Sequence, residues 1–409
     1  MKELSEALWK NGSHLLYLTA CALQGKTPAA EQVAAMDLRG IYRLAKWHSM
    51  RAVSYYGVKA WLDASGQAPA EAQEALAKWK EAYNKAIRKN LLFDIERKGL
   101  EAFMEQQGIW YMPLKGTLLK EWYPQAGMRE MADNDILFDV AFRQKVHDFM
   151  VAKGYEDAHY IAPEEAGDEP VAAGVHDNYY KQPIYNFEMH FALFCDASSP
   201  VWTEYYKDVK ERLVPVEGTS CRYRFTDEDF YVYMTTHASK HFNGGGHGMR
   251  NLMDVVVFLK TKPHMDMGYI EQELTKLGLA EHEKNVHSLA CKVFEPAFWE
   301  AEAPLEALTE AERELLALCI SAGTYGTTER LVENSLKKMS DKNEITLANR
   351  LTYLRKRLFA DKSTYLVLYP QLAKHKWMLP FCVIHRMFRG LFTARKRLWG
   401  EMKSIWRAK

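Results

Sequence analysis

The sequence predicts an α+β fold in which a group of short strands lies between two helical regions. Apolar residues recur three and four positions apart over residues 1–107, β-type runs begin after Gly108, and helical spacing returns after residue 225. The expected regions are a helical N-terminal region over residues 1–88, a core over residues 89–225 and a helical C-terminal region over residues 226–409.

The N-terminal helices are predicted from the spacing of large apolar side chains. Leu4 and Leu8 follow this spacing near the start, and Leu91 and Ile95 follow it before the core. The segment 65–69 contains glycine and proline, so we expect a break between helices there.

The core is predicted to alternate strands with helices. The expected elements are, in order, a strand over 109–114, a helix over 117–122, a strand over 134–138, a helix over 141–153 and a strand over 184–193. In the last strand the apolar residues Phe187 and Met189 alternate with polar residues, and the acidic segment 162–175 before it is expected to be a loop.

A hairpin and a long helical region are predicted after the core strands. The hairpin is expected over residues 213–225, with its turn at 217–219. Thr226 and the acids that follow it are typical of a helix start, because a threonine side chain caps free N–H groups and the first turn favours negative charge.

Composition places the chain among ordinary globular proteins. Its 409 residues are 48% hydrophobic and 26% charged, with a net charge of +1, which excludes a wholly disordered or fibrous chain. Six cysteines are scattered singly, which fits a reducing compartment and argues against a zinc ribbon or a disulfide scaffold. The sequence contains neither a secretory signal nor an apolar run long enough to span a bilayer, so we expect a cytoplasmic protein.

The C-terminal tail, residues 374–409, differs from the rest of the chain in charge. It holds ten Lys/Arg and one acid, a net charge of +9, which leaves −8 for the other residues. Its aromatic residues are interleaved with these cations, a pattern compatible with RNA or DNA and equally with peripheral attachment to an anionic membrane. A third interpretation is a final helix whose aromatic face packs on its own domain.

Two features of the core predict chemistry. Asp133 and Asp135 are two apart at the start of a strand and so share a face, where Glu188 on a neighbouring strand can complete an all-oxygen site for Mg²⁺ or Mn²⁺. Lys115 and Gly116 stand at a strand-to-helix junction, where backbone N–H groups and a cation attract phosphate. The alternatives are ordinary surface acids and a turn that holds no ligand.

Four short motifs, in this order, resemble a group of bacterial nucleotidyltransferases of the DNA polymerase β superfamily, the uncharacterised nucleotidyltransferase group. The motifs are residues 113–116, 127–129, 133–137 and 187–190, and the resemblance covers about residues 90–260. It implies a small mixed sheet flanked by helices. The chain departs from the superfamily in one respect, because Gly116-Thr117 stands where Gly-Gly or Gly-Ser is usual.

The resemblance also implies roles for named residues. Asp133, Asp135 and Glu188 would be the catalytic residues and the metal ligands, with Glu188 helping to activate the acceptor hydroxyl. The nucleotide-binding residues would be Lys115, Gly116, Thr117 and Arg129, of which Lys115 and Arg129 are suited to neutralise the triphosphate.

The expected function is metal-dependent transfer of an NMP from an NTP, such as ATP, to an acceptor hydroxyl. RNA, a protein, a sugar or another small molecule would all fit as acceptor. The alternative is a non-catalytic nucleotide-binding or partner-binding module with the same fold. His237 and His241 are four apart on a predicted helix, but no ligand at a matching spacing completes a zinc site, so we expect them to pack near the core or to contact a phosphate.

Overall fold

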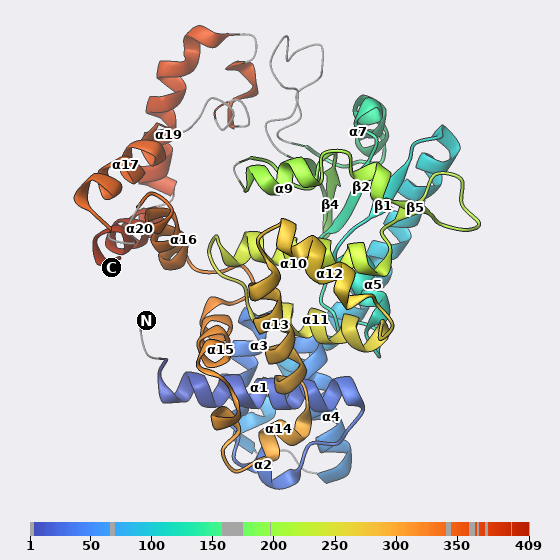
Figure 1. The fold of residues 1–409 in the computed structure, drawn as a ribbon, viewed down its shortest axis with the longest axis vertical. Coiled ribbons are helices and arrows are strands. Elements are labelled where there is room, and N and C mark those ends of the chain that lie inside the picture. Colours follow the sequence, from blue (N-terminus) through green and yellow to red (C-terminus); the bar gives the residue numbers. More distant parts are fainter. Residues whose placement is uncertain are drawn as a thin grey trace.

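The computed structural model shows the predicted α+β fold, in which a small mixed sheet lies between helical N- and C-terminal regions (Figure 1). The described residues are 4–65, 70–157, 175–196, 198–340, 345–359, 365, 368–372, 375–393 and 395–408. The expected break at 65–69 and the expected loop at 162–175 lie outside these residues, except for Ser65 and Val175.

The N-terminal region is helical, as predicted. Its helices are α1 (Glu6–Gln24), α2 (Ala30–Ala34), α3 (Leu38–Trp47), α4 (Arg51–Ser65) and α5 (Gln73–Gln107), with a short 3-10 helix at Ala70–Ala72. α1 packs on α4 at close range, because Gly57 has no side chain and a Cβ there would lie 2.4 Å from the carbonyl oxygen of Leu18. α5 runs without interruption across the expected boundary between residues 88 and 89.

Four strands form the sheet in the order β1-β2-β4-β3. They are β1 (Tyr111–Pro113), β2 (Asn134–Phe138), β3 (His176–Lys181) and β4 (Tyr185–His190). β2 and β4 are parallel, while β1 and β3 are antiparallel to their neighbours, so the sheet is mixed. The strands expected over 109–114, 134–138 and 184–193 are confirmed, two of them with shorter bounds.

The sequence analysis did not predict β3. This strand reads His-Asp-Asn-Tyr-Tyr-Lys and lacks the apolar alternation that marks a half-buried strand. One of its inward-facing residues is Asp177, which is buried and accepts two hydrogen bonds from the guanidinium of Arg143. A pattern based on apolar residues cannot detect a strand whose buried position holds an ion pair.

The two faces of the sheet have different neighbours. One face packs on α5 and α7 (Arg143–Ala152) through an apolar cluster, to which β4 contributes Phe187 and Met189. The opposite face carries polar side chains. It lies beside α10 (Asp227–Phe242), because Lys115 and Asp135 are close enough to His237 of that helix for their charges to shift its pKa. This second face is where the candidate site forms.

Short elements and a long helical region complete the fold, as predicted. Thr226 caps α10 by accepting a hydrogen bond from the N–H of Asp229. The other elements are α6 (Gly116–Leu119), α9 (Pro200–Tyr205), the hairpin β5 (Val214–Pro215) and β6 (Tyr223–Arg224), α11 (Met249–Thr261), α12 (Met267–Lys276), α13 (Ala280–Val293), α14 (Pro296–Glu300), α15 (Glu310–Ala322), α16 (Thr328–Lys337), α17 (Leu347–Leu358), α19 (Leu379–Thr393) and α20 (Arg395–Arg407). Six further 3-10 helices are at Lys120–Trp122, Val140–Phe142, Val209–Arg212, Pro304–Ala307, Pro370–Leu372 and Lys376–Met378.

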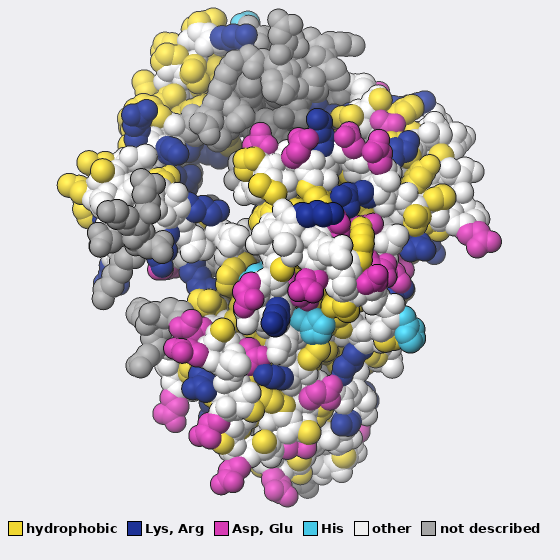
Figure 2. Space-filling view, viewed as in Figure 1, with side chains coloured by type: hydrophobic (Ala, Val, Ile, Leu, Met, Phe, Trp, Pro, Cys, Tyr) yellow, Lys and Arg dark blue, Asp and Glu magenta, His cyan; other side chains and the backbone are white. Residues whose placement is uncertain are grey.

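The tail helices α19 and α20 pack by small parts of their surface. Ile405 is buried in a cluster with residues of α16 and α17, and Cys382 is buried beside Tyr365 and Tyr369. The large tail aromatics instead face solvent, each 55–80% exposed: Trp377, Phe381, Phe388, Phe392, Trp399 and Trp406. Hydrophobic side chains are visible on the surface over α19 (Figure 2). The interpretation that this aromatic face packs on its own domain is therefore wrong, because other side chains make the contacts.

Within the part of the chain that the structure describes, none of the helices combines the length and apolar character that crossing a bilayer requires.

Candidate functional site

Three carboxylates come together on the polar face of the sheet. Asp135 in β2 lies opposite Glu188 in β4 in the parallel register, so both side chains leave the sheet on the same side. Asp133 is two residues before Asp135 and lies close to both. Burial, followed by the negative charges of Asp135 and Glu188, raises the pKa of Asp133 to about 7. The structure thus places Asp135 beside Glu188 and both within range to shift the pKa of Asp133.

The ammonium group of Lys115 lies between two of these carboxylates. Its Nζ is 2.6 Å from Oδ1 of Asp135 and 3.7 Å from Oε2 of Glu188. Burial alone would lower the pKa of Lys115, but the charges of Asp135, Tyr233 and Glu188 and the hydrogen bond to Asp135 together outweigh burial, and the pKa is raised. The backbone of Lys115 has φ +47°, a conformation that is costly for a side chain other than glycine and is typical of functional sites.

Asp135 also contacts a histidine that the sequence analysis used only as a polar strand residue. Nε2 of His190 is 2.9 Å from Oδ1 of Asp135 and 3.6 Å from Oε2 of Glu188. Burial would raise the pKa of Asp135, yet the charge of Lys115 and the hydrogen bond with His190 hold it well below its usual range. Asp135 and Asp133 therefore have opposite pKa shifts, although they are only two residues apart.

Gly116 and Thr117 lie in the turn between β1 and α6, the strand-to-helix junction that was predicted. Both are buried at the start of α6, and a Cβ on Gly116 would lie 2.2 Å from Nη1 of Arg129, so no other residue fits without displacing that guanidinium. The hydroxyl of Thr117 is buried and has no hydrogen-bond partner among the described residues. The expected free N–H groups are fewer than the sequence suggested, because the N–H of Thr117 donates to the carbonyl of Leu114 and that of Leu118 donates to Lys115.

Arg129 occupies a different environment from the one the sequence suggested. Its guanidinium is buried and donates two hydrogen bonds to Asp254 of α11, from Nε at 2.8 Å and from Nη2 at 3.0 Å. The hydroxyl of Tyr123 donates to the same carboxylate. Asp254 lies 125 residues from Arg129, so no local pattern could have revealed this partner.

Helix α10 contributes a row of basic side chains beside the carboxylates. Nε2 of His237 and Nε2 of His241 are 3.3 Å apart, and His247 is adjacent to His241. Burial, and then neighbouring positive charge, lowers the pKa of His241 to about 4 and that of His247 to about 3. The pKa of Lys240 is also lowered, by burial first and then by Lys115. The charge of Lys115 acts on both His237 and His241, so they lie near the predicted core, and their contact with a phosphate stays a prediction.

Two further cations reach the carboxylates from other helices. Arg250 of α11 acts on Asp133 through its charge, and it donates a hydrogen bond to the carbonyl of Glu130. Lys89 of α5 donates to the carbonyl of Ala132, and burial lowers its pKa although Asp133 opposes that shift. The sequence analysis missed both residues, because cations on distant helices carry no signal of where their side chains point.

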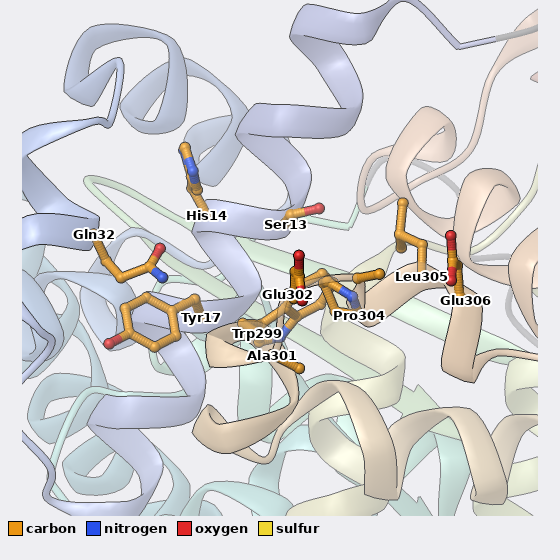
Figure 3. Close-up of a pocket in the computed structure, with 11 residues that line it drawn as sticks. Ser13, His14, Tyr17, Gln32, Trp299, Ala301, Glu302, Pro304, Leu305 and Glu306 are labelled. Atoms are coloured by element: carbon orange, nitrogen blue, oxygen red, sulfur yellow. The ribbon is translucent and has the colours of Figure 1, made fainter.

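A cavity of about 420 Å³ lies elsewhere, between α1 and the chain after α14. Figure 3 shows its lining, which includes Tyr17, Gln32 and Glu302. No residue of the carboxylate cluster lines this cavity, so it does not contribute to the site described above.

Comparison with known proteins supplies one match. A family model described as an uncharacterised nucleotidyltransferase matches residues 34–295, which include all the elements that form the carboxylate cluster. No curated protein and no solved structure matches the chain.

Proposed function

Because this chain belongs to the uncharacterised nucleotidyltransferase family, we propose that it moves an NMP from an NTP to an acceptor hydroxyl with Mg²⁺ or Mn²⁺. The observation that carries this proposal is that Asp135 and Glu188 share one face of β2 and β4 and that the charges of both act on Asp133, just before β2. We further infer that the strategy is that of the DNA polymerase β superfamily, which the sequence resembles.

The chemistry of the cluster fits a divalent cation. All three side chains offer oxygen, the ligand that Mg²⁺ and Mn²⁺ prefer. A positive group, the ammonium of Lys115, already lies between two of them, and burial together with the negative charges of Asp135 and Glu188 raises the pKa of Asp133, so a bound cation would relieve this repulsion. When bound, such an ion stabilises negative charge on the attacking and leaving oxygens of a phosphoryl group.

The chain's own residues would position the nucleotide. Lys115 can turn from the carboxylates to a phosphate once another cation neutralises them, and the buried Thr117 hydroxyl has no competing partner for a phosphate oxygen. Lys240 and Arg250 are the cations of α10 and α11 whose charges act on the cluster, so we assign them to the triphosphate. Arg129 instead stabilises the turn at Gly116, because the ion pair with Asp254 holds its guanidinium against that glycine.

The direct test combines nucleotide binding with product analysis. Each NTP is titrated calorimetrically with and without Mg²⁺, and pyrophosphate release and acceptor mass are then followed with RNA, protein and small-molecule acceptors. We expect Mg²⁺-dependent binding of at least one NTP and a mass gain of one NMP. NTP binding without pyrophosphate release from any acceptor would favour the alternative, a non-catalytic nucleotide-binding module.

Replacing Lys115 by methionine is expected to weaken NTP binding about 10- to 100-fold at saturating Mg²⁺. The reason is that a charge-assisted hydrogen bond to phosphate contributes about 1.5–3 kcal/mol. Calorimetric titration of the NTP measures the effect, and Lys120→Met is the matched control, because Lys120 pairs with Asp94 rather than with the carboxylate cluster. Unchanged affinity in Lys115→Met would mean that the turn at residues 115–116 has only a structural role.

We also propose that the exposed aromatic and basic face of residues 374–409 contacts an anionic partner, either a nucleic acid or a membrane surface. The aromatic rings are 55–80% exposed and are near Arg386 and Arg389 in the sequence. Contact of large apolar rings with water is unfavourable, so a cluster of them beside cations indicates a binding surface. This proposal concerns a partner and is independent of the catalytic one.

The double variant Phe388→Ser/Phe392→Ser is expected to lose binding to that partner with a change in stability within about 0.5 kcal/mol, because both rings are exposed. Co-sedimentation with phosphatidylserine vesicles and titration with tRNA at the same salt concentration separate the membrane from the RNA. Tyr325→Ser removes an equally exposed ring outside the tail and is the control. Binding that survives the double variant would show that the tail cations act without the rings.

A further inference from the structure

Two histidines meet Glu188 at one end of the strand pair β3 and β4. His176 and His190 are opposite each other in the antiparallel register, and Glu188 is two residues before His190 on the same face. One ligand atom from each of the three side chains lies within 4.8 Å of the other two. This spacing is compatible with a single ion bound by all three.

Both imidazoles have a buried nitrogen with no partner. Nδ1 of His176 and Nδ1 of His190 are inaccessible to solvent, and neither forms a hydrogen bond among the described residues. His190 is only 3% exposed, so water does not solvate its ring. A buried polar atom without a partner destabilises a fold, so such atoms call for a physical explanation, such as a bound ion.

The contacts of His190 resemble those of a metal-binding histidine. Nε2 of its ring is 2.9 Å from Oδ1 of Asp135 and 3.6 Å from Oε2 of Glu188, and Nδ1 is the unpartnered ring nitrogen. Histidines that bind metals usually hydrogen-bond a carboxylate through their second nitrogen, which fixes the orientation of the ring. Asp135 supplies that carboxylate here.

We propose that His176, Glu188 and His190 form a second cation site, adjacent to the oxygen site and selective for a divalent transition ion such as Zn²⁺ or Co²⁺. Imidazole nitrogen is a good ligand for these ions and a poor one for Mg²⁺. Three protein ligands leave at least one coordination position open for water or another ligand, as in catalytic rather than structural zinc sites. The site shares Glu188 with the proposed Mg²⁺ site but does not require that nucleotidyl transfer occurs.

The test is a titration of the full-length, metal-free protein with Co²⁺, followed by its visible d–d absorption, and with Zn²⁺ by competition. We expect one Co²⁺ per chain with a spectrum typical of nitrogen ligation, and displacement by Zn²⁺ but not by an equal concentration of Mg²⁺. His176→Asn is expected to weaken Co²⁺ binding at least tenfold. His176 is the better residue to replace, because it is less buried than His190.

Three control variants make the result decisive. His264→Asn replaces an exposed histidine and should leave Co²⁺ binding unchanged. Asp133→Asn removes a ligand of the proposed Mg²⁺ site only, so it should keep Co²⁺ binding while losing Mg²⁺-dependent NTP binding. His241→Asn disrupts the other histidine pair and should also keep Co²⁺ binding.

Two outcomes would overturn the proposal, and a third would separate it from the proposed function. Co²⁺ binding that survives His176→Asn but is lost in His241→Asn would move the ion to the histidines of α10. Absence of Co²⁺ binding in the wild-type protein would remove the second site altogether, even if Mg²⁺ and NTP bind as proposed. Conversely, Co²⁺ binding that depends on His176 in a protein that binds no NTP would support the second site and contradict the proposed function.

Discussion

Replacing Asp133 by asparagine is expected to lower the rate of Mg²⁺-dependent nucleotidyl transfer about a thousandfold or more while the fold is kept. Loss of one carboxylate ligand removes several kcal/mol of the stabilisation that a bound metal gives to the transition state, and about 4 kcal/mol corresponds to a thousandfold. The rate is measured as pyrophosphate release at saturating NTP and Mg²⁺. An unchanged rate would show that Asp133 is not a metal ligand.

The same variant is expected to be at least as stable as the wild-type protein without metal at pH 7. The folded-state pKa of Asp133 is about 7, above the ordinary value of an aspartate, so its ionisation destabilises the fold. This destabilisation is absent below the ordinary pKa, near pH 4, and grows as the pH rises to about 7. The stability difference between Asp133→Asn and wild type should therefore increase over that interval, which urea unfolding at several pH values can measure.

Asp135→Asn provides the contrast. It should abolish metal binding as well, but it should also destabilise the protein, because Lys115 loses its 2.6 Å partner and His190 loses its 2.9 Å partner. Relief of repulsion between carboxylates is expected from Asp133→Asn and not from Asp135→Asn, since the low pKa of Asp135 reflects attraction to Lys115. Equal stability of the two variants without metal would contradict this assignment.

Arg129→Ala is expected to lower the free energy of unfolding by about 3–5 kcal/mol, the usual cost of leaving one partner of a buried ion pair without the other. The variant would remove the hydrogen bonds that Arg129 donates to the buried carboxylate of Asp254. The hydrogen bond from the hydroxyl of Tyr123 would be kept. It would also remove the guanidinium that contacts Gly116, so the turn after β1 should loosen. Urea unfolding at pH 7 measures the stability, and calorimetry at low temperature measures NTP affinity.

Two further variants separate a structural role from a role in phosphate binding. The double variant Arg129→Met/Asp254→Leu removes both charges and should recover part of the lost stability. Arg51→Ala breaks a more exposed pair with Glu130 and should cost less. A large loss of NTP affinity in Arg129→Ala with unchanged stability would restore the role that the sequence suggested, direct contact with the triphosphate.

The sequence by itself determined the order of the main elements other than β3 and the residues that share a face. Side chains two apart on a strand point to the same side, so the spacing of Asp133 and Asp135 and the alternation around Glu188 were enough to select the three acids. Capping by Thr226 and the end of the helix before Gly154 were also predictable, because each depends on a few neighbouring residues. These are local properties of the chain.

Only the tertiary structure decided which charges neutralise one another. Arg129 pairs with Asp254 across 125 residues, and His190 contacts Asp135 across 55 residues, through a parallel register that no local pattern encodes. β3 was not predicted either. Its buried Asp177 is neutralised by Arg143 of α7, so the strand lacks the alternation of apolar residues by which strands are predicted. The physical reason is the same in each case: periodicity fixes the direction of a side chain, whereas the partner that it meets depends on how distant elements pack.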